Sequence, residues 1–178
     1  MADRLPVGPI GGRSLLLLRH AKSAWPAGVA DVERPLAPRG ERAAALVGRF
    51  LADHDLVPDR VVSSPARRAA ETAALVVAAL DGAAVGRPVE RAVELAVELD
   101  RRLYDGDVLA AVLEHLAGTP RLLAVGHEPD LVDVVRALSG AEVRIPTAGL
   151  VWLDVHEGAP TATVRLVLPP KLLDTRPA

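Results

Sequence analysis

Leu15-Leu16-Leu17-Leu18-Arg19-His20-Ala21-Lys22-Ser23 is the stretch that decides the fold, because a short apolar run ends abruptly in a cation and an imidazole. Four leucines are too few to cross a membrane, and they are typical of a buried β-strand. In α/β folds, reactive side chains follow the carboxyl ends of such strands. An unprotonated His20 can act as a nucleophile, and the planar guanidinium of Arg19 can bind an anion. The pair therefore points to phosphate chemistry.

Length and composition restrict the class of protein. The chain has 178 residues, half of them hydrophobic, so one domain can bury a full core without disulfides or a metal. It contains two Trp, one Tyr and one Phe, and its net charge is -2, so we do not expect it to bind nucleic acid. The absence of cysteine excludes thiol chemistry and cysteine-bound zinc. Phosphate binding must then come from a local cluster of Arg and His.

No targeting or metal-binding pattern is evident. The start Met1-Ala2-Asp3-Arg4 lacks a basic-then-apolar signal, and the apolar runs are short, so we expect a cytoplasmic protein without a membrane partner. No spacing of His, Asp and Glu resembles a metal site, so neither a metal nor another cofactor is expected. His54, His115 and His156 have no motif around them, and we expect them to have surface or structural roles. The oligomeric state is not predicted.

Alternating strand and helix patterns divide the chain into a flexible leader (1–13), one domain (14–168) and a tail (169–178). The patterns predict strands at 15–18, 60–65, 89–99 and 121–125, helices at 41–52, 66–80, 107–117 and 129–138, a connector at 81–88, and a hairpin of 148–155 with 161–168. This order predicts a three-layer α/β/α sandwich with a mainly parallel central sheet and an antiparallel hairpin at the C-terminal end. The connection before residue 41 is rich in proline, which favours an irregular, functional loop.

Three predicted strands each end in a segment that carries a cation or an imidazole: Arg19-His20, Ser64-Pro65-Ala66-Arg67-Arg68 and Gly126-His127. If these strands lie side by side, the segments meet in one crevice beyond the carboxyl ends of the strands. Guanidinium groups and a histidine can surround a tetrahedral anion there while the other histidine attacks it in line.

In this order, the segments resemble the histidine phosphatase superfamily, and the start Arg19-His20-Ala21-Lys22-Ser23 resembles its small phosphohistidine phosphatase branch. The resemblance runs from about Leu15 to Leu168 and includes Arg34-Pro35-Leu36 with Gly40. It implies that His20 is the nucleophile. It also implies that Arg19, Arg68 and His127 bind the phosphate. Because Arg67 and Arg68 are adjacent, only one can face inward, and the motif spacing favours Arg68.

The resemblance does not point to a single residue as the general acid. Many superfamily members supply it as a Glu between the second and third motifs, where this chain offers Glu98, Asp100 and Asp105. Asp105 is the first choice, because it lies in a loop before a predicted helix and could reach over a pocket. Whether an acid is needed at all is left open. The sequence also departs from the commonest pattern by placing Ala21, not glycine, after His20.

Further residues of the long connection are candidates for the rim of the pocket. Lys22, Ser23 and Arg34 are assigned to the rim, although ordinary surface charge explains Lys22 and Arg34 equally well. Trp25 is expected to pack over the loop and not to contact substrate.

The resemblance implies a metal-independent phosphatase that hydrolyses protein phosphohistidine through a covalent phosphohistidine on His20. One alternative is a phosphatase of small phosphate monoesters or nucleotides. Another is a phosphate-binding module without turnover. The expected partner is a phosphorylated protein or a small phosphate compound.

Overall fold

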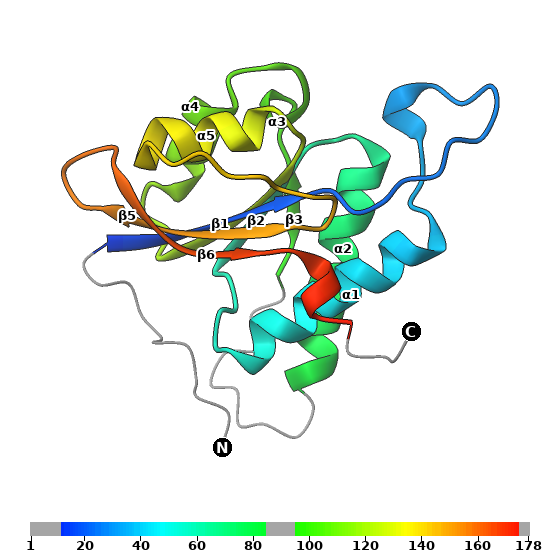
Figure 1. Ribbon diagram of the computed structural model, residues 1–178, viewed down its shortest axis with the longest axis horizontal. Coiled ribbons are helices and arrows are strands. Elements are labelled where there is room, and N and C mark those ends of the chain that lie inside the picture. Colours follow the sequence, from blue (N-terminus) through cyan, green and yellow to red (C-terminus); the bar gives the residue numbers. More distant parts are fainter. Residues whose placement is uncertain (1–11, 85–94, 175–178) are drawn as a thin grey trace.

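A computed structural model describes residues 12–84 and 95–174 (Figure 1). Its elements are β1 (Gly12–Arg19), the 3-10 helix η1 (Asp31–Glu33), α1 (Pro38–Asp53), β2 (Arg60–Ser63), α2 (Arg67–Ala84), β3 (Val97–Leu99), α3 (Arg102–Asp105), α4 (Val108–Leu116), β4 (Arg121–Gly126), α5 (Asp130–Ser139), β5 (Leu150–His156), β6 (Ala162–Leu168) and the 3-10 helix η2 (Pro170–Leu172). Of the predicted leader, Gly12 and Arg13 belong to β1, and the remaining residues lie outside the described ranges.

The strands form one sheet in the order β3-β2-β4-β1-β5-β6. β1 and β2 each run parallel to β4, and β2 also runs parallel to β3. β5 is antiparallel to both β1 and β6. The predicted mainly parallel sheet with an antiparallel C-terminal hairpin is therefore confirmed.

Helices cover both faces of this sheet, which explains the uninterrupted leucine run of β1. Leu16 and Leu18 pack in one core cluster with residues of α1 and α2. Leu15 and Leu17 pack in a second cluster with residues of α4 and α5. Successive strand side chains point to opposite faces, so a strand buried on both sides is apolar at every position. Figure 1 shows α1 and α2 on one side of the sheet and α3 to α5 on the other, as the predicted three layers require.

Several element boundaries differ from the prediction. α2 continues to Ala84, so residues 81–84 are helical where the pattern predicted a connector. Gly82 weakens a helix by only about 1 kcal/mol, which the packed remainder of α2 tolerates. Of the predicted strand 89–99, only Val97–Leu99 form a strand, β3, and residues 85–94 lie outside the described ranges. The four-residue helix α3 was not predicted, because it is too short to show periodicity.

The long connection and the C-terminal segment contain short ordered pieces. η1 lies inside the connection, and Ser23 bridges to Leu36 across its base. At the other end, η2 follows β6, and Leu173 packs against the core cluster that contains Leu16. No helix in the described ranges is long and apolar enough to cross a membrane.

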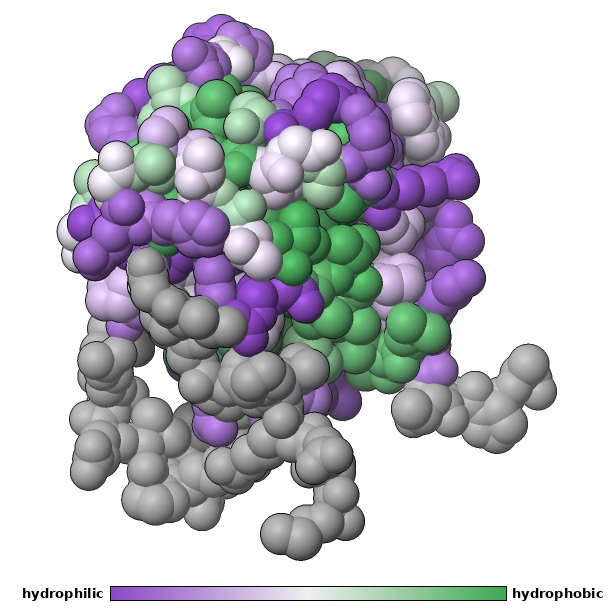
Figure 2. Space-filling model, turned by 60° about the vertical axis from the view of Figure 1, so that its left-hand side comes forward, coloured by the Kyte–Doolittle hydropathy of each residue, from purple (hydrophilic) through white to green (hydrophobic). Residues whose placement is uncertain are grey.

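The face drawn in Figure 2 carries hydrophilic side chains beside a contiguous hydrophobic area. The large hydrophobic side chains most exposed among the described residues are Trp25, Val29, Val57, Leu99, Val167 and Leu172.

Candidate active site

The carboxyl ends of β1, β4 and β2 lie side by side and level with one another. Leu18 and Ser63 both pair with Val125, from opposite sides of β4. The chain leaves each strand at this edge, and the backbone N–H of His20 donates to the Gly126 carbonyl at 2.9 Å. The structure thus brings together the three segments that the sequence predicted to converge. The ring centroids of His20 and His127 are 5.0 Å apart.

His20 is held in one tautomer. Its Nδ1 lies 2.8 Å from the carbonyl oxygen of Ala21. Because a carbonyl can only accept, Nδ1 carries the proton and Nε2 keeps its lone pair. Burial lowers the pKa of His20 to about 4, and the charges of Arg68, Arg19 and Arg34 act in the same direction. At neutral pH the ring is therefore uncharged, and its Nε2 lone pair is available to attack an electrophile.

His127 is buried and follows directly after β4. Its Nε2 is 2.8 Å from Ser64 Oγ, and its Nδ1 is 3.5 Å from an Nη of Arg68. Since a guanidinium can only donate, this pairing places the proton of His127 on Nε2, where it is donated to Ser64. Burial, followed by the charge of His20, lowers the pKa of His127 to about 3. Both histidines are thus neutral in the unliganded protein.

Arg68, not Arg67, faces the site. Its side chain is only 8% exposed, and its two Nη atoms donate to the carbonyl oxygen and Oδ2 of Asp31 at 2.6 and 2.9 Å. Arg67 points to solvent, where it pairs with Glu71. Thr72, one turn further along α2, donates to the Arg68 carbonyl and accepts from the Ala21 backbone N–H. These bonds fix the start of α2 to the loop that follows His20.

Arg19 lies at the edge of the cluster. It donates to the Ile145 carbonyl at 2.8 Å and forms an ion pair with Glu128, the residue after His127. Its positive charge nevertheless lowers the pKa of both His20 and His127. A phosphate bound beside His20 would therefore be attracted by Arg19 as well as by Arg68.

The sequence did not single out Asp31, and it assigned no function to Tyr104. Asp31 bridges two arginines, because its Oδ1 accepts from Arg34 at 2.8 Å and its Oδ2 accepts from Arg68. The hydrogen bond from Arg34 is the main cause that lowers the pKa of Asp31. Tyr104 donates to the same carboxylate at 3.3 Å and packs the edge of its ring against His127. The only sequence signal for Asp31 was an acidic residue three positions before an arginine in the loop.

The three proposed general acids are instead bound in ion pairs. Asp105 pairs with Arg101 on the surface, and Glu98 pairs with Arg60. Asp100 accepts from Arg102 and from His115. Hydrogen bonds from these arginines are the main cause that lowers the pKa of each carboxyl group, that of Asp100 most strongly.

A general acid must hold a proton, so none of these three carboxylates is suited to the role. Tyr104, the neighbour of Asp105, is the residue of this segment that reaches His127.

Two of the proposed rim residues, Ser23 and Arg34, are buried and form hydrogen bonds within the loop. Ser23 is buried, and its Oγ accepts from Arg34. The Arg34 side chain is 8% exposed, and its Nε donates to the Ala24 carbonyl. Lys22 is half-buried, and its carbonyl accepts from the Ala37 N–H. The sequence could not distinguish a buried side chain that stabilises the loop from a side chain at the rim of the pocket, because both are polar residues in a loop.

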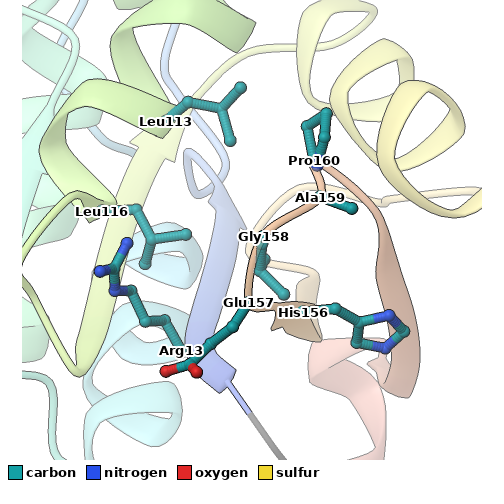
Figure 3. A pocket seen from close by; sticks show the side chains of 9 residues that line it. Arg13, Leu113, Leu116, His156, Glu157, Gly158, Ala159 and Pro160 are labelled. Carbon is teal, nitrogen blue, oxygen red and sulfur yellow. The ribbon is translucent and has the colours of Figure 1, made fainter.

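A separate cavity of about 370 Å³ lies at the other end of β1, where Arg13, Leu113, Leu116 and His156 contribute to its wall (Figure 3). Arg13 and His20 are seven residues apart along β1, which corresponds to roughly 23 Å of extended chain. This cavity therefore does not belong to the histidine cluster. Within residues 12–84 and 95–174, no group of three or more His, Asp or Glu side chains is placed to hold a metal ion.

Comparison with known families agrees with this geometry. The model of the histidine phosphatase superfamily (branch 1) matches residues 15–103. The chain belongs to the histidine phosphatase superfamily. An uncharacterized protein of Mycobacterium tuberculosis (strain ATCC 25618 / H37Rv) is 33% identical over 163 residues, covering 79% of this chain and 93% of the relative.

Among solved structures, this histidine phosphatase resembles the small SixA branch, as the sequence predicted. A protein of Agrobacterium tumefaciens assigned as the phosphohistidine phosphatase SixA has 25% identity and a TM-score of 0.72, covering 89% of this chain and 99% of the other. The protein histidine phosphatase SixA in complex with tungstate has 20% identity and a TM-score of 0.76, covering 90% and 99%. At 20% identity, this second likeness concerns the fold alone.

If His20 is the nucleophile, its lowered pKa predicts that this histidine phosphatase stays active at acidic pH. His20 must be neutral to attack, so activity is lost as pH falls through its folded pKa, about 4, and not through 6.5. We expect NMR titration of the ring C2 protons in the free protein to show two histidines that titrate below pH 5, with His20→Asn and His127→Asn assigning them. Because the two rings interact, the midpoints belong to the pair. Titration of His20 near pH 6.5 would contradict the buried geometry.

Proposed function

We propose that the protein hydrolyses protein phosphohistidine through a covalent phosphohistidine intermediate on His20. The observation that carries this proposal is the bond from His20 Nδ1 to the Ala21 carbonyl, which leaves Nε2 unprotonated within a cluster of cationic side chains. Membership of the histidine phosphatase superfamily supports phosphatase activity, and the likeness to the SixA branch supports the substrate.

The first step transfers the phosphoryl group between two imidazoles. The Nε2 lone pair of His20 attacks phosphorus, the P–N bond of the substrate breaks, and its electron pair returns to the leaving nitrogen. Protonated beforehand on its other ring nitrogen, the substrate imidazole departs neutral and needs no proton from the enzyme. His20 keeps its proton on Nδ1, where the Ala21 carbonyl accepts it. The charges of Arg19 and Arg68 stabilise the phosphoryl oxygens.

The second step returns the enzyme to its starting state. Water attacks phosphorus, the bond to His20 Nε2 breaks, and inorganic phosphate leaves. The proton lost by the water can pass to a phosphate oxygen or to Nδ1 of His127, the ring nitrogen that faces Arg68. Because guanidinium groups supply the positive charge, we propose that the reaction needs neither a metal nor another cofactor.

The state of the carboxylates favours a nitrogen-bound phosphate. A phosphate ester expels an alkoxide, which must receive a proton as it leaves. The carboxylates that contact the site's arginines, Asp31 and Glu128, are held in ion pairs, and so are Glu98, Asp100 and Asp105. An ion-paired carboxylate is a poor proton donor, and this arrangement therefore suits an imidazole leaving group better than an alkoxide.

The proposal is tested by rapid mixing, in EDTA, with two peptides of the same sequence that carry phosphohistidine or phosphoserine. We expect a burst of dephosphorylated peptide equal to the enzyme concentration, and at least a tenfold preference in kcat/KM for phosphohistidine. Asp105→Asn serves as the control and should alter either rate by less than about twofold, since Asp105 pairs only with surface Arg101 among the contacts described. Faster hydrolysis of phosphoserine would favour the monoester alternative, and binding without a burst would favour a non-catalytic module.

A further inference from the structure

Trp25 is more exposed than any other large hydrophobic side chain that the structure describes. Its exposed fraction is 74%, although one face of its ring packs against Arg34 of the same loop, as expected. Val29, on the same loop, is 39% exposed. Figure 1 shows this loop, between β1 and α1, projecting beyond the sheet and α2. An exposed indole leaves a large apolar area in water, which is typical of a contact surface for a partner.

The Arg34 side chain lies against one face of the exposed Trp25 ring. The Arg34 guanidinium carbon lies 3.2 Å from the ring centroid, so a cation covers one face of the indole. Arg34 is itself fixed, because its three nitrogens donate to the Ala24 carbonyl, Asp31 Oδ1 and Ser23 Oγ. The Trp25 ring thus has one face against a fixed cation and the other face open to an apolar group of a partner.

The exposed ring of Trp25, called the Trp25 platform below, is connected to the proposed phosphate-binding cluster of His20, Arg68 and His127. Arg34 contacts Asp31, and Asp31 Oδ2 accepts from Arg68, which lies beside His127. The charge of Arg34 also lowers the pKa of His20, so the base of the platform lies within electrostatic range of the nucleophile. Two side chains, those of Arg34 and Asp31, therefore link Trp25 to Arg68.

We infer that Trp25 binds the polypeptide that carries the phosphohistidine, an inference that rests on the proposed function. A phosphoryl group held between His20 and Arg68 fixes one side chain of the substrate, and the peptide on either side of it must cross the mouth of the site. The free face of the indole offers this segment an apolar contact, which suits an aliphatic or aromatic residue next to the phosphohistidine. A small phosphate compound would not extend to this platform.

The test compares a phosphohistidine peptide with N-phosphoimidazole, which has the same leaving group and no polypeptide. We expect Trp25→Ala to raise KM for the peptide at least tenfold with little change in kcat, and to change the kinetics of phosphoimidazole by less than twofold. Trp25→Phe should restore most of the affinity for the peptide. Leu172→Ala, which removes a similarly exposed side chain from η2, should change neither substrate.

Equal losses of activity on both substrates would show that Trp25 only maintains the structure of the loop, and this result would overturn the inference. Unchanged kinetics on both substrates would overturn it as well. A wild-type protein that does not hydrolyse the phosphohistidine peptide would instead contradict the proposed function, so the two failures are distinguishable.

Tryptophan fluorescence gives a second measurement that does not depend on turnover. Trp152 is buried, with 1% exposure, so acrylamide quenches mainly Trp25. We expect the phosphohistidine peptide, bound to an inactive His20→Ala variant, to protect Trp25 from quenching, whereas phosphoimidazole should not. Equal quenching with and without the peptide would overturn the inference.

Discussion

His20→Ala is expected to lower turnover at least about a thousandfold and to leave the fold intact, because His20 supplies the attacking lone pair. The ring lies beyond the carboxyl end of β1, and removing it leaves the pairing of β1 with β4 and β5 unchanged. Steady-state rates with the phosphohistidine peptide measure the loss, and thermal unfolding checks the fold. Retention of more than a few per cent of the activity would show that His20 is not the nucleophile.

The covalent intermediate gives an independent measure of the same prediction. Wild-type protein mixed with a peptide carrying labelled phosphoryl groups and quenched in alkali should retain label, since phosphohistidine is stable to alkali. The His20→Ala variant should retain none. His156→Ala is a suitable control, because His156 is exposed at the opposite end of the sheet and should be labelled like wild type.

The sequence predicted the parts of the site that follow directly from strands. β1, β2 and β4 each show a short apolar run, and the rule that ligands bind beyond the carboxyl ends of parallel strands placed His20, Arg68 and His127 together. This reasoning succeeds because strand periodicity is local and adjacent parallel strands end at the same edge. The choice of Arg68 over Arg67 followed similarly from the position of the motif at the start of α2.

The remaining contacts depend on how loops cross the site, which no local pattern encodes. Asp31 reaches Arg68 although 37 residues separate them, and Tyr104 reaches Asp31 across 73 residues. Arg34 was expected at the rim, yet four partners from its own loop bury it. Trp25 was expected to pack over the loop, and Arg34 of that loop covers one face of its ring, but the side chain is still 74% exposed. Side-chain types alone do not distinguish these outcomes.

Arg68→Ala is expected to reduce kcat by about 30-fold to 1000-fold, equivalent to about 2 to 4 kcal/mol of transition-state stabilisation. Arg68 is buried and oriented by two bonds to Asp31, so its charge acts on the phosphoryl group in a region that excludes most water. Arg68→Lys should recover only part of the rate, because an ammonium keeps the charge but cannot reproduce both bonds of the planar fork.

A change in pH dependence separates this electrostatic role from a general loss of structure. The positive charge of Arg68 lowers the pKa of both His20 and His127, so its removal must raise both pKa values. The ring titrations of Arg68→Ala should therefore move from below pH 5 toward 6.5, while those of Arg67→Ala stay as in wild type. Arg67 is exposed and paired with Glu71, so its removal should also leave kcat within about twofold. Wild-type kinetics in Arg68→Ala together with a large loss in Arg67→Ala would reverse the assignment. An unshifted titration in Arg68→Ala would show that the guanidinium does not act on the histidines through its charge.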